Sequence, residues 1–230
     1  MPRTARVAPG GMVFHVLNRA NNQDRIFAKD RDYLAFLQVL CDALDKKSMR
    51  ILSYCLMPNH WHLLLWPRQD GELGEFLQTV TTTHVRRWRL HRQSVGGGHL
   101  YQGTYKSFPV QEDDHFYRVC RYVERNALRA GLVARAEDWR WGSLWQRLQH
   151  VAPNGYPPLH PWPVLLPRTW TVYVNQPENE AELLAMRTSV RRGRPFGTEL
   201  WQERTAKQLG LESTFRPRGR PTVRKGDKSN

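Results

Sequence analysis

Two strongly apolar segments, residues 50–57 and 60–67, are separated only by Pro58 and Asn59. Both intervening residues favour turns, so the pattern predicts two consecutive strands joined by a tight turn. Pro67 ends the second strand because proline cannot donate a hydrogen bond to a neighbouring strand. The chain is therefore expected to contain a β-sheet, and the segments on either side of this strand pair decide its fold class.

The flanking segments alternate between strand and helix patterns. Between residues 30 and 47 apolar side chains recur every three or four positions, and Lys46 and Lys47 come last, as a helix favours. The predicted elements are a strand at 12–20, a helix at 30–47, strands at 50–57 and 60–67, a helix at 72–91, a strand at 103–111 and a helix at 115–128. Pro109 restricts the last strand to a sheet edge or a bulge. This order predicts a ferredoxin-like, split-βαβ fold of the α+β class with an antiparallel sheet.

Composition divides the chain into three parts. We expect a first domain at 1–150, a Pro-rich connector at 151–177, and a basic helical extension with a tail at 178–230 that binds DNA. The first domain would end with a fourth helix at about 136–149. The connector contains too many prolines for regular structure. It is nevertheless expected to lie against the domain, because exposing its large apolar residues would be costly. These residues are Trp162, Leu165, Leu166 and Trp170.

The charge balance points to a polyanionic partner. The 230 residues contain 35 Lys and Arg against 21 Asp and Glu, and residues 187–230 alone hold twelve basic and four acidic residues. The net charge of +14, of which this last segment carries +8, favours nucleic acid. No apolar run reaches the roughly 18 residues of a membrane-spanning helix, and no signal segment follows the basic N-terminus. We therefore expect a cytoplasmic, nucleoid-associated protein with no membrane partner, in which the unpaired Cys41, Cys55 and Cys120 stay reduced.

The segment His60-Trp61-His62 lies in the second of the two paired strands. Side chains alternate between the faces of a strand, so both imidazoles point to one face and Trp61 to the other. Two imidazoles on one rigid strand form a pair of potential metal ligands. The spacing alone is equally compatible with two polar side chains on a half-buried surface.

Tyr122 lies on the helix predicted at 115–128, and Asn126 follows it by one turn on the same face. A tyrosine hydroxyl can attack a phosphodiester and retain the phosphate as an ester. Its ordinary pKa near 10 means that it needs a nearby cation or base. Tyr101, Tyr105 and Tyr117 are competing candidates, and a tyrosine in such a pattern can also serve packing alone.

Taken together, these motifs resemble the REP-associated tyrosine transposases, a branch of the single-tyrosine HUH endonuclease superfamily of IS200-like transposases. The matching stretches are FHVLNRANNQDRIF at 14–27, YCLMPNHWHLLLWP at 54–67, RYVERNALRAGLVARAEDWRWGSL at 121–144 and RRGRPFGTELWQERTAKQLGLESTFRPRGRP at 191–221. They occur in the family order and extend over nearly the whole chain.

The resemblance implies a ferredoxin-like palm in which His60 and His62 bind Mg²⁺ or Mn²⁺, Tyr122 is the nucleophile and Asn126 supplies a third ligand. It also implies a transposase-like endonuclease and strand transferase that acts on single-stranded, REP-type hairpin DNA through a 5′-phosphotyrosine intermediate, as a monomer or a homodimer. Relatives often have Asn-Pro where this chain has Asn126-Ala127. The missing proline predicts that the helix continues past Asn126.

Eight residues are candidates for DNA contacts. They are Asn18 and Arg19 where the first strand ends, Arg86 and Arg87 in the Arg-rich segment 79–92, and Arg192, Arg194, Arg218 and Arg220 in two Arg-Gly-Arg-Pro runs. The segment 79–92 could hold phosphates and stack unpaired bases, or form a solvated face with Trp88 in the core. The Arg-Gly-Arg-Pro runs resemble the core of an AT-hook, which enters the minor groove, or form a basic surface that touches phosphates without selectivity.

Two other functions remain compatible with the sequence. The first is a hairpin DNA- or RNA-binding module with an inactive palm. The second is a hydrolase in which His60 and His62 bind zinc and water is the nucleophile, which would form no covalent intermediate. Only the transposase-like enzyme would form a covalent protein–DNA adduct, so a test for this adduct distinguishes it from both alternatives.

Overall fold

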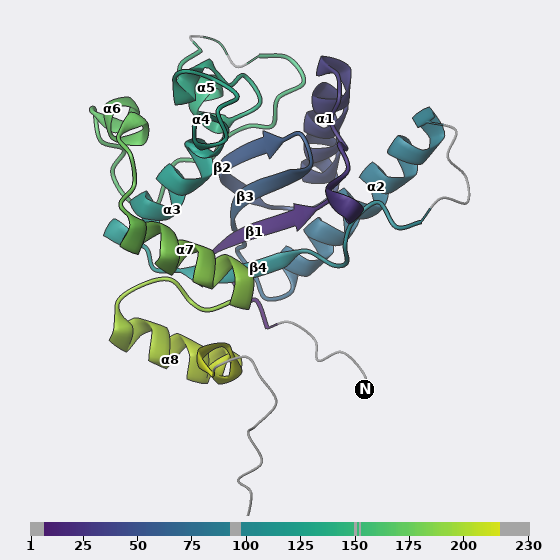
Figure 1. Cartoon of the computed structure of the whole chain (residues 1–230). Helices are drawn as coiled ribbons and strands as arrows, with labels where there is room; N and C mark the ends of the chain where they lie inside the picture. The colour runs from purple at the N-terminus through teal and green to yellow at the C-terminus, as the bar shows by residue number, and fades with distance from the viewer. Residues whose placement is uncertain (1–6, 93–97, 150, 152, 217–230) are drawn as a thin grey trace, which may run out of the picture.

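The computed structural model describes residues 7–92, 98–149, 151 and 153–216. Its centre is a four-stranded sheet with the order β2-β3-β1-β4, in which every neighbouring pair is antiparallel (Figure 1). The strands are β1 (Val13–Arg19), β2 (Arg50–Met57), β3 (His60–Trp66) and β4 (Lys106–Val110). This order and the chain sequence βαββαβ confirm the predicted ferredoxin-like α+β fold.

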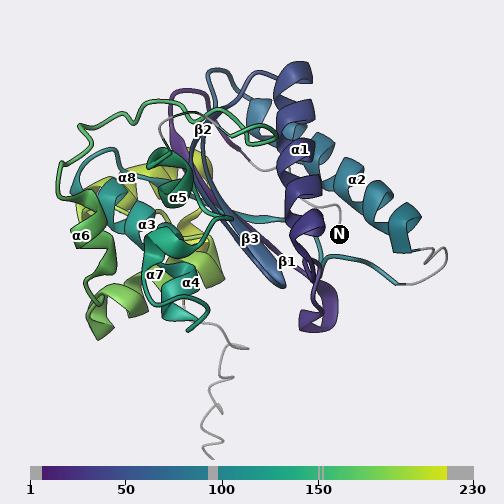
Figure 2. The same ribbon diagram turned by 90° about the horizontal axis from the view of Figure 1, so that it is seen from above.

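One face of the sheet is covered by α1 (Asp30–Lys46) and α2 (Glu72–Arg92), as Figure 2 shows. Their apolar stripes pack on the side chains that β1, β2 and β3 direct to this face, and Phe36, Trp61 and Phe76 are all fully buried there. Within the described residues, none of the helices is long and apolar enough to cross a membrane. The two helices therefore fix one face of the palm and leave the other for the remaining elements.

The second face is covered by α3 (Asp114–Glu124) and the four helices that follow it (Figure 2). These are α4 (Asn126–Arg129), α5 (Ser143–Arg147), α6 (Trp170–Asn175) and α7 (Glu180–Arg192), whereas α8 (Glu199–Leu209) lies below α7 in Figure 1, away from this face. Three short 3-10 turns, Asn21–Gln23, Ala136–Asp138 and Glu212–Phe215, complete the described elements. Val119 and Cys120 of α3 meet Leu64 and Phe108 of the sheet in a second core.

The prediction of one helix at 136–149 is wrong. The segment forms a 3-10 turn, Ala136–Asp138, and the short α5 instead. The backbone of Trp139 and Gly142 is extended, and Trp139 Nε1 donates to the carbonyl oxygen of Leu56. Docking of the indole on β2 thus outweighs the local helical pattern.

The connector predicted at 151–177 lies against the palm. After Pro167 it forms α6. Trp162 Nε1 donates to the carbonyl oxygen of Leu52, and Trp170 is buried. The expectation that Leu165 and Leu166 are covered is wrong, because they are 89% and 48% exposed. The tryptophans, which each combine a large apolar ring with an N–H donor, anchor the connector without them.

Pro109 lies in β4, at the edge of the sheet, as expected for a proline in a strand. Beyond this edge Phe196, between α7 and α8, makes an isolated parallel bridge to Val110. The Phe196 amide donates to the carbonyl oxygen of Pro109, and the Gln111 amide donates to that of Phe196. The described part of the C-terminal extension, residues 178–216, therefore packs along the edge of the sheet through Phe196.

A fully buried carboxylate, Glu124, joins α3 to the elements behind it. Its side chain accepts hydrogen bonds from Ser53, Ser143, Arg147 and Trp170, at 2.6 to 3.1 Å. We expect Glu124→Ala to lower the free energy of unfolding by about 3–5 kcal/mol, because it leaves a partly buried arginine and three further donors without their acceptor.

Urea unfolding measures this loss. The matched control is Glu75→Gln in the exposed pair with Lys47, which should change the free energy of unfolding by less than about 1 kcal/mol. Equal effects of the two substitutions would contradict the role assigned to Glu124.

The buried His84 makes stability depend on pH. Its Nδ1 lies 2.5 Å from the Tyr101 hydroxyl, which accepts a hydrogen bond from Trp61 Nε1, and burial lowers the pKa of His84 from 6.5 to about 3. Between these values the unfolded chain binds a proton that the folded chain does not, so stability falls as pH falls, by about 1.4 kcal/mol per pH unit. Urea midpoints at pH 7.5 and 5.0 should reflect this, with a shallower pH dependence in His84→Gln. An unchanged slope in that variant would contradict the assignment.

Candidate active site

His60 and His62 lie on β3, in the interior of the sheet, and face α3. Their ring centroids are 5.0 Å apart, whereas Trp61 between them lies in the core under α1 and α2. The alternation of the strand therefore brings both imidazoles to one face, as the sequence predicts. Both are buried, His62 more completely than His60.

A third histidine, His15 of β1, belongs to this cluster, and sequence reasoning missed it. Its Nε2 lies 2.8 Å from Nδ1 of His62, and its ring stacks on Phe108 at 4.6 Å. The available signal was the alternation of β1, which places His15 and Leu17 on the face opposite Phe14 and Val16. A hydrogen bond at Nδ1 orients the His62 ring, and with Nδ1 donating, Nε2 keeps a lone pair for a metal.

Helix α3 begins where the sequence predicts, since the Asp113 carboxylate caps the amide of His115 at 2.8 Å. Helical backbone continues past Asn126, as expected, but not as one helix: α3 ends at Glu124, and α4 begins at Asn126 and ends at Arg129. At the junction the Arg125 backbone has a ψ of −4°. The Arg125 guanidinium donates to the carbonyl oxygens of Val174 and Asn175. Anchoring of Arg125 on the connector accompanies this one-residue break.

The break leaves Asn126 next to His60. The Asn126 carboxamide nitrogen lies 3.5 Å from Nε2 of His60, while Nδ1 of His60 donates to the Asn59 carboxamide oxygen at 2.6 Å. Because the amide oxygen of Asn59 can only accept, the proton of His60 is on Nδ1, and the unprotonated Nε2 accepts from the Asn126 amide. Rotation of the Asn126 amide by 180° would place its oxygen next to this nitrogen.

Tyr122 is the tyrosine that lies beside this cluster. Its ring meets that of His62 nearly at right angles at 5.8 Å, and the guanidinium of Arg129 lies over it at 4.2 Å. Of the competing candidates, Tyr117 donates its hydroxyl hydrogen bond to the Leu165 carbonyl oxygen, and Tyr101 and Tyr105 pack on the other side of the sheet. Geometry therefore favours Tyr122 among the four.

The electrostatics of the cluster favour neutral imidazoles. Burial, and to a smaller extent the charges of Arg19 and Arg129, lower the pKa of His60 to about 3. Burial also lowers the pKa of His62 well below its ordinary value. Metal ligation requires neutral imidazole, so the histidines are in the form that a cation needs at neutral pH.

The donor set fits a divalent cation. Within the described residues, no group of three or more His, Cys, Asp or Glu side chains is arranged to hold a metal, so a third protein ligand here would be the Asn126 amide oxygen. Two imidazole nitrogens and one oxygen suit Mn²⁺ better than Mg²⁺, which prefers oxygen. Such a site leaves coordination positions for phosphate oxygens.

The candidate DNA-binding residues of the first domain lie near α2 and at the end of β1. Asn18 and Arg86 line a groove of about 1110 Å³ between α2 and residues 98–105, and the exposed Arg19 follows Asn18 at the end of β1. Arg87 is exposed but forms an ion pair with Asp42 at 2.5 Å. Tyr101 and Tyr105 also line this groove, so it lies on the face of the sheet covered by α1 and α2, opposite the face of the histidine pair.

The arginines of the first Arg-Gly-Arg-Pro run are engaged within the extension. Arg192 donates to the carbonyl oxygens of Ser213, Thr214 and Arg216, and Arg194 donates to the Gln202 side chain. Arg218 and Arg220, in the second run, lie outside the described residues. The prediction that these four arginines bind DNA stays a prediction.

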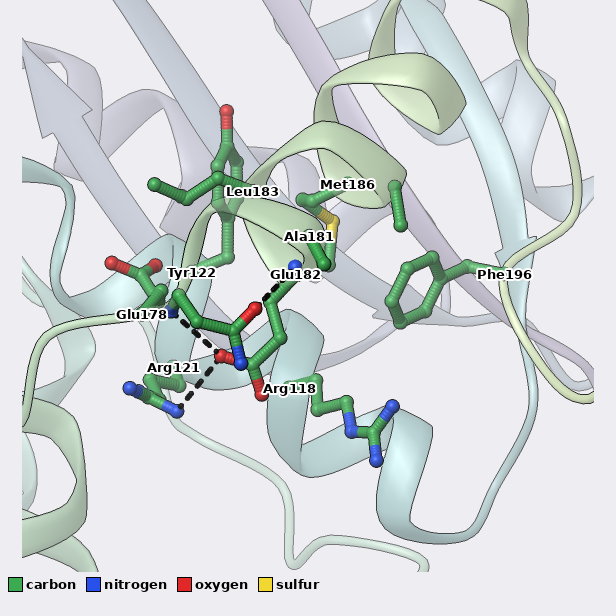
Figure 3. A pocket seen from close by; sticks show the side chains of 11 residues that line it. Arg118, Arg121, Tyr122, Glu178, Ala181, Glu182, Leu183, Met186 and Phe196 are labelled. Atoms are coloured by element: carbon green, nitrogen blue, oxygen red, sulfur yellow. Dashed lines mark hydrogen bonds and ion pairs between the residues drawn. The ribbon is translucent and has the colours of Figure 1, made fainter.

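A cavity of about 340 Å³ separates α3 from α7 next to Tyr122 (Figure 3). In Figure 3 the Tyr122 ring rises along one side of this cavity, and Glu178 and Glu182 come from the opposing segment. Arg121, another lining residue, donates to the carbonyl oxygens of Gln176 and Pro177 at the end of the connector. Residues 178–186 of the C-terminal extension thus line the same cavity as Tyr122.

Comparison with known proteins shows the family of the chain and its fold. A sequence model of the family described as Transposase IS200 like matches residues 10–126, just over half of the chain. Among solved structures, the chain is similar to a REP-associated tyrosine transposase bound to a REP hairpin, with 14% identity and a TM-score of 0.51, over 67% of this chain and 90% of that one.

A second similar structure is described as a candidate transposase from Deinococcus radiodurans R1. It has 18% identity and a TM-score of 0.39, over 54% of this chain and 97% of that one. No curated protein sequence matches the chain significantly. At these identities the match to the REP-associated protein shows a shared fold, and the family match rests on the sequence from β1 to Asn126.

Proposed function

This chain belongs to the family of IS200-like transposases, and from this premise we propose that it is a metal-dependent endonuclease and strand transferase for single-stranded, hairpin-forming DNA. Its intermediate would be a 5′-phosphotyrosine at Tyr122. The observation that carries the proposal is the position of the Tyr122 ring, 5.8 Å from that of His62, on the face shared with His60 and Asn126.

The reaction is a transesterification. The Tyr122 oxygen attacks the scissile phosphorus, the bond to the 3′-oxygen breaks, and that oxygen leaves as a 3′-hydroxyl after taking up a proton, while the phenol loses its own. Attack by another 3′-hydroxyl on the phosphotyrosine reverses the step and joins strands. A divalent cation held by His60, His62 and Asn126 would polarise the phosphate and offset its developing charge.

The residues around the nucleophile support the same assignment. His15 orients His62 through their hydrogen bond, and burial, which lowers the pKa of His60 and of His62, keeps both imidazoles neutral. Because Tyr122 and the two histidines come from one chain, a monomer contains the complete set of groups. We therefore propose that a monomer suffices for cleavage, while a homodimer remains compatible with strand exchange.

Hairpin DNA is the proposed substrate because of charge and shape. The chain has a net charge of +14, and Asn18 and Arg86 line a groove of about 1110 Å³ between α2 and residues 98–105. The similar REP-associated transposase is bound to a REP hairpin. Such a substrate places our proposed enzyme in the cytoplasm with the nucleoid.

The test uses hairpin oligonucleotides from REP-like repeats of the source genome, labelled at the 5′ or the 3′ end and incubated with Mn²⁺, Mg²⁺ or EDTA. A denaturing gel should show a metal-dependent protein–DNA adduct that carries the 3′ label only. Hairpin binding without adduct or cleavage would favour the inactive binding module. Cleavage without adduct would favour the hydrolase with water as its nucleophile.

A further inference from the structure

Arg129 makes three contacts around the proposed nucleophile. Its guanidinium carbon lies 4.2 Å from the centroid of the Tyr122 ring, and one of its terminal nitrogens donates to the Tyr122 carbonyl oxygen at 3.1 Å. The other terminal nitrogen donates to Glu178 at 2.7 Å. The guanidinium thus holds both the backbone and the ring of the tyrosine, although it follows Tyr122 by seven residues.

Glu178 fixes this arginine from the C-terminal extension. It lies in the segment between α6 and α7, its side chain is only 7% exposed, and its second oxygen pairs with Arg125 at 3.2 Å. Arg125 in turn donates to the carbonyl oxygens of Val174 and Asn175. The Glu178 carboxylate therefore links the extension to Arg125 and Arg129, which lie on the helical segment that carries Tyr122 and Asn126.

We propose that Arg129 is a positioning residue for Tyr122, and that Glu178 holds Arg129 in place, so that the C-terminal extension completes the active site. This inference rests on the proposed function. Both residues lie beyond Asn126, where the family match ends. The extension is thus assigned a part in the chemistry of the palm, in addition to any contact of its tail with DNA.

The chemistry of the guanidinium explains why an arginine is needed. Its plane can stack on the phenol ring while its N–H groups donate in that same plane, which the lysine ammonium cannot do. Attack on phosphorus requires alignment within a fraction of an ångström, and a misplacement of about 1 Å can cost a hundredfold in rate. A tyrosine ring held on one side by His62 and covered by Arg129 has few other orientations.

The test is single-turnover adduct formation at saturating hairpin with Mn²⁺, with hairpin affinity measured separately in EDTA. Arg129→Gln should slow adduct formation about a hundredfold, and Glu178→Gln about tenfold, while the dissociation constant for hairpin changes less than about twofold. Arg129→Lys should recover part of the rate, since it restores the cation but not the planar fork. In the double variant Arg129→Gln/Glu178→Gln, the rate should equal that of Arg129→Gln alone, because Glu178 acts through Arg129.

The matched control is Arg135→Gln, which removes an exposed arginine from another Arg–Glu pair and should leave the rate unchanged. Melting temperatures identify variants that merely fail to fold. An adduct rate equal to wild type in Arg129→Gln, a faster rate in Glu178→Gln, or a loss confined to hairpin affinity would each overturn the inference. These outcomes require that the wild-type protein form the adduct; if it forms none, the proposed function fails as well.

Discussion

Tyr122→Phe should form no covalent protein–DNA adduct and should cleave hairpin DNA at least about a thousandfold more slowly than the wild type. The substitution removes one oxygen and keeps the ring, so the contacts with His62 and Arg129 persist. Hairpin affinity should therefore change less than about twofold. Gel analysis of adduct and product, with affinity measured by filter binding, separates the two effects.

The matched control for this variant is Tyr117→Phe. Tyr117 precedes Tyr122 on the same helix, but its hydroxyl donates to the carbonyl oxygen of Leu165 in the connector. Its loss should leave the adduct rate within about twofold of wild type. If Tyr122→Phe retained the adduct and Tyr117→Phe lost it, the nucleophile would be Tyr117, and the geometric argument for Tyr122 would fail.

His60→Gln should lower the adduct rate by about 100- to 1000-fold and weaken the binding of Mn²⁺ by at least about tenfold. The glutamine keeps a polar group next to Asn59 but removes the imidazole nitrogen that faces Asn126. Calorimetric titration with Mn²⁺ and single-turnover gels measure the two quantities. EDTA treatment of the wild-type protein should reproduce the loss of rate, and added Mn²⁺ should restore it in the wild type alone.

A histidine outside the cluster provides the control for this metal site. His160 lies in the connector, where its Nδ1 donates to the carbonyl oxygen of Pro161. His160→Gln should leave both Mn²⁺ affinity and adduct rate unchanged. An adduct rate that does not respond to His60→Gln or to EDTA would show that cleavage requires no metal at this pair.

The strands were predictable because their signals are local. Pro58 and Asn59 mark a turn, alternation sets the faces of β3, and together they place His60 and His62 as the structure has them. Where a long-range contact outweighs the local pattern, prediction fails: the helix expected at 136–149 is replaced by a segment whose Trp139 docks on β2.

In the candidate site, too, local patterns could be predicted from the sequence, whereas long-range contacts could not. Tyr122 and Asn126 could be paired from their spacing, since one helical turn separates them. The alternation of β1 sets the face of His15, but its contact with His62 comes from sheet pairing across 47 residues. Glu178 could not be predicted, because it meets Arg129 across 49 residues through docking of the extension. A single sequence does not reveal which of its charged residues such docking will bring together.

Identification of the amino acid that carries the DNA tests the central claim most directly. The adduct is purified, trimmed with nuclease to a short nucleotide, and digested with trypsin, which cleaves after Arg118, Arg121 and Arg125. Tyr122 and Tyr117 then fall in different peptides, at 122–125 and 107–118. The account predicts that mass spectrometry finds the nucleotide on the peptide 122–125. Nucleotide on the peptide 107–118, or on any other residue, would contradict it.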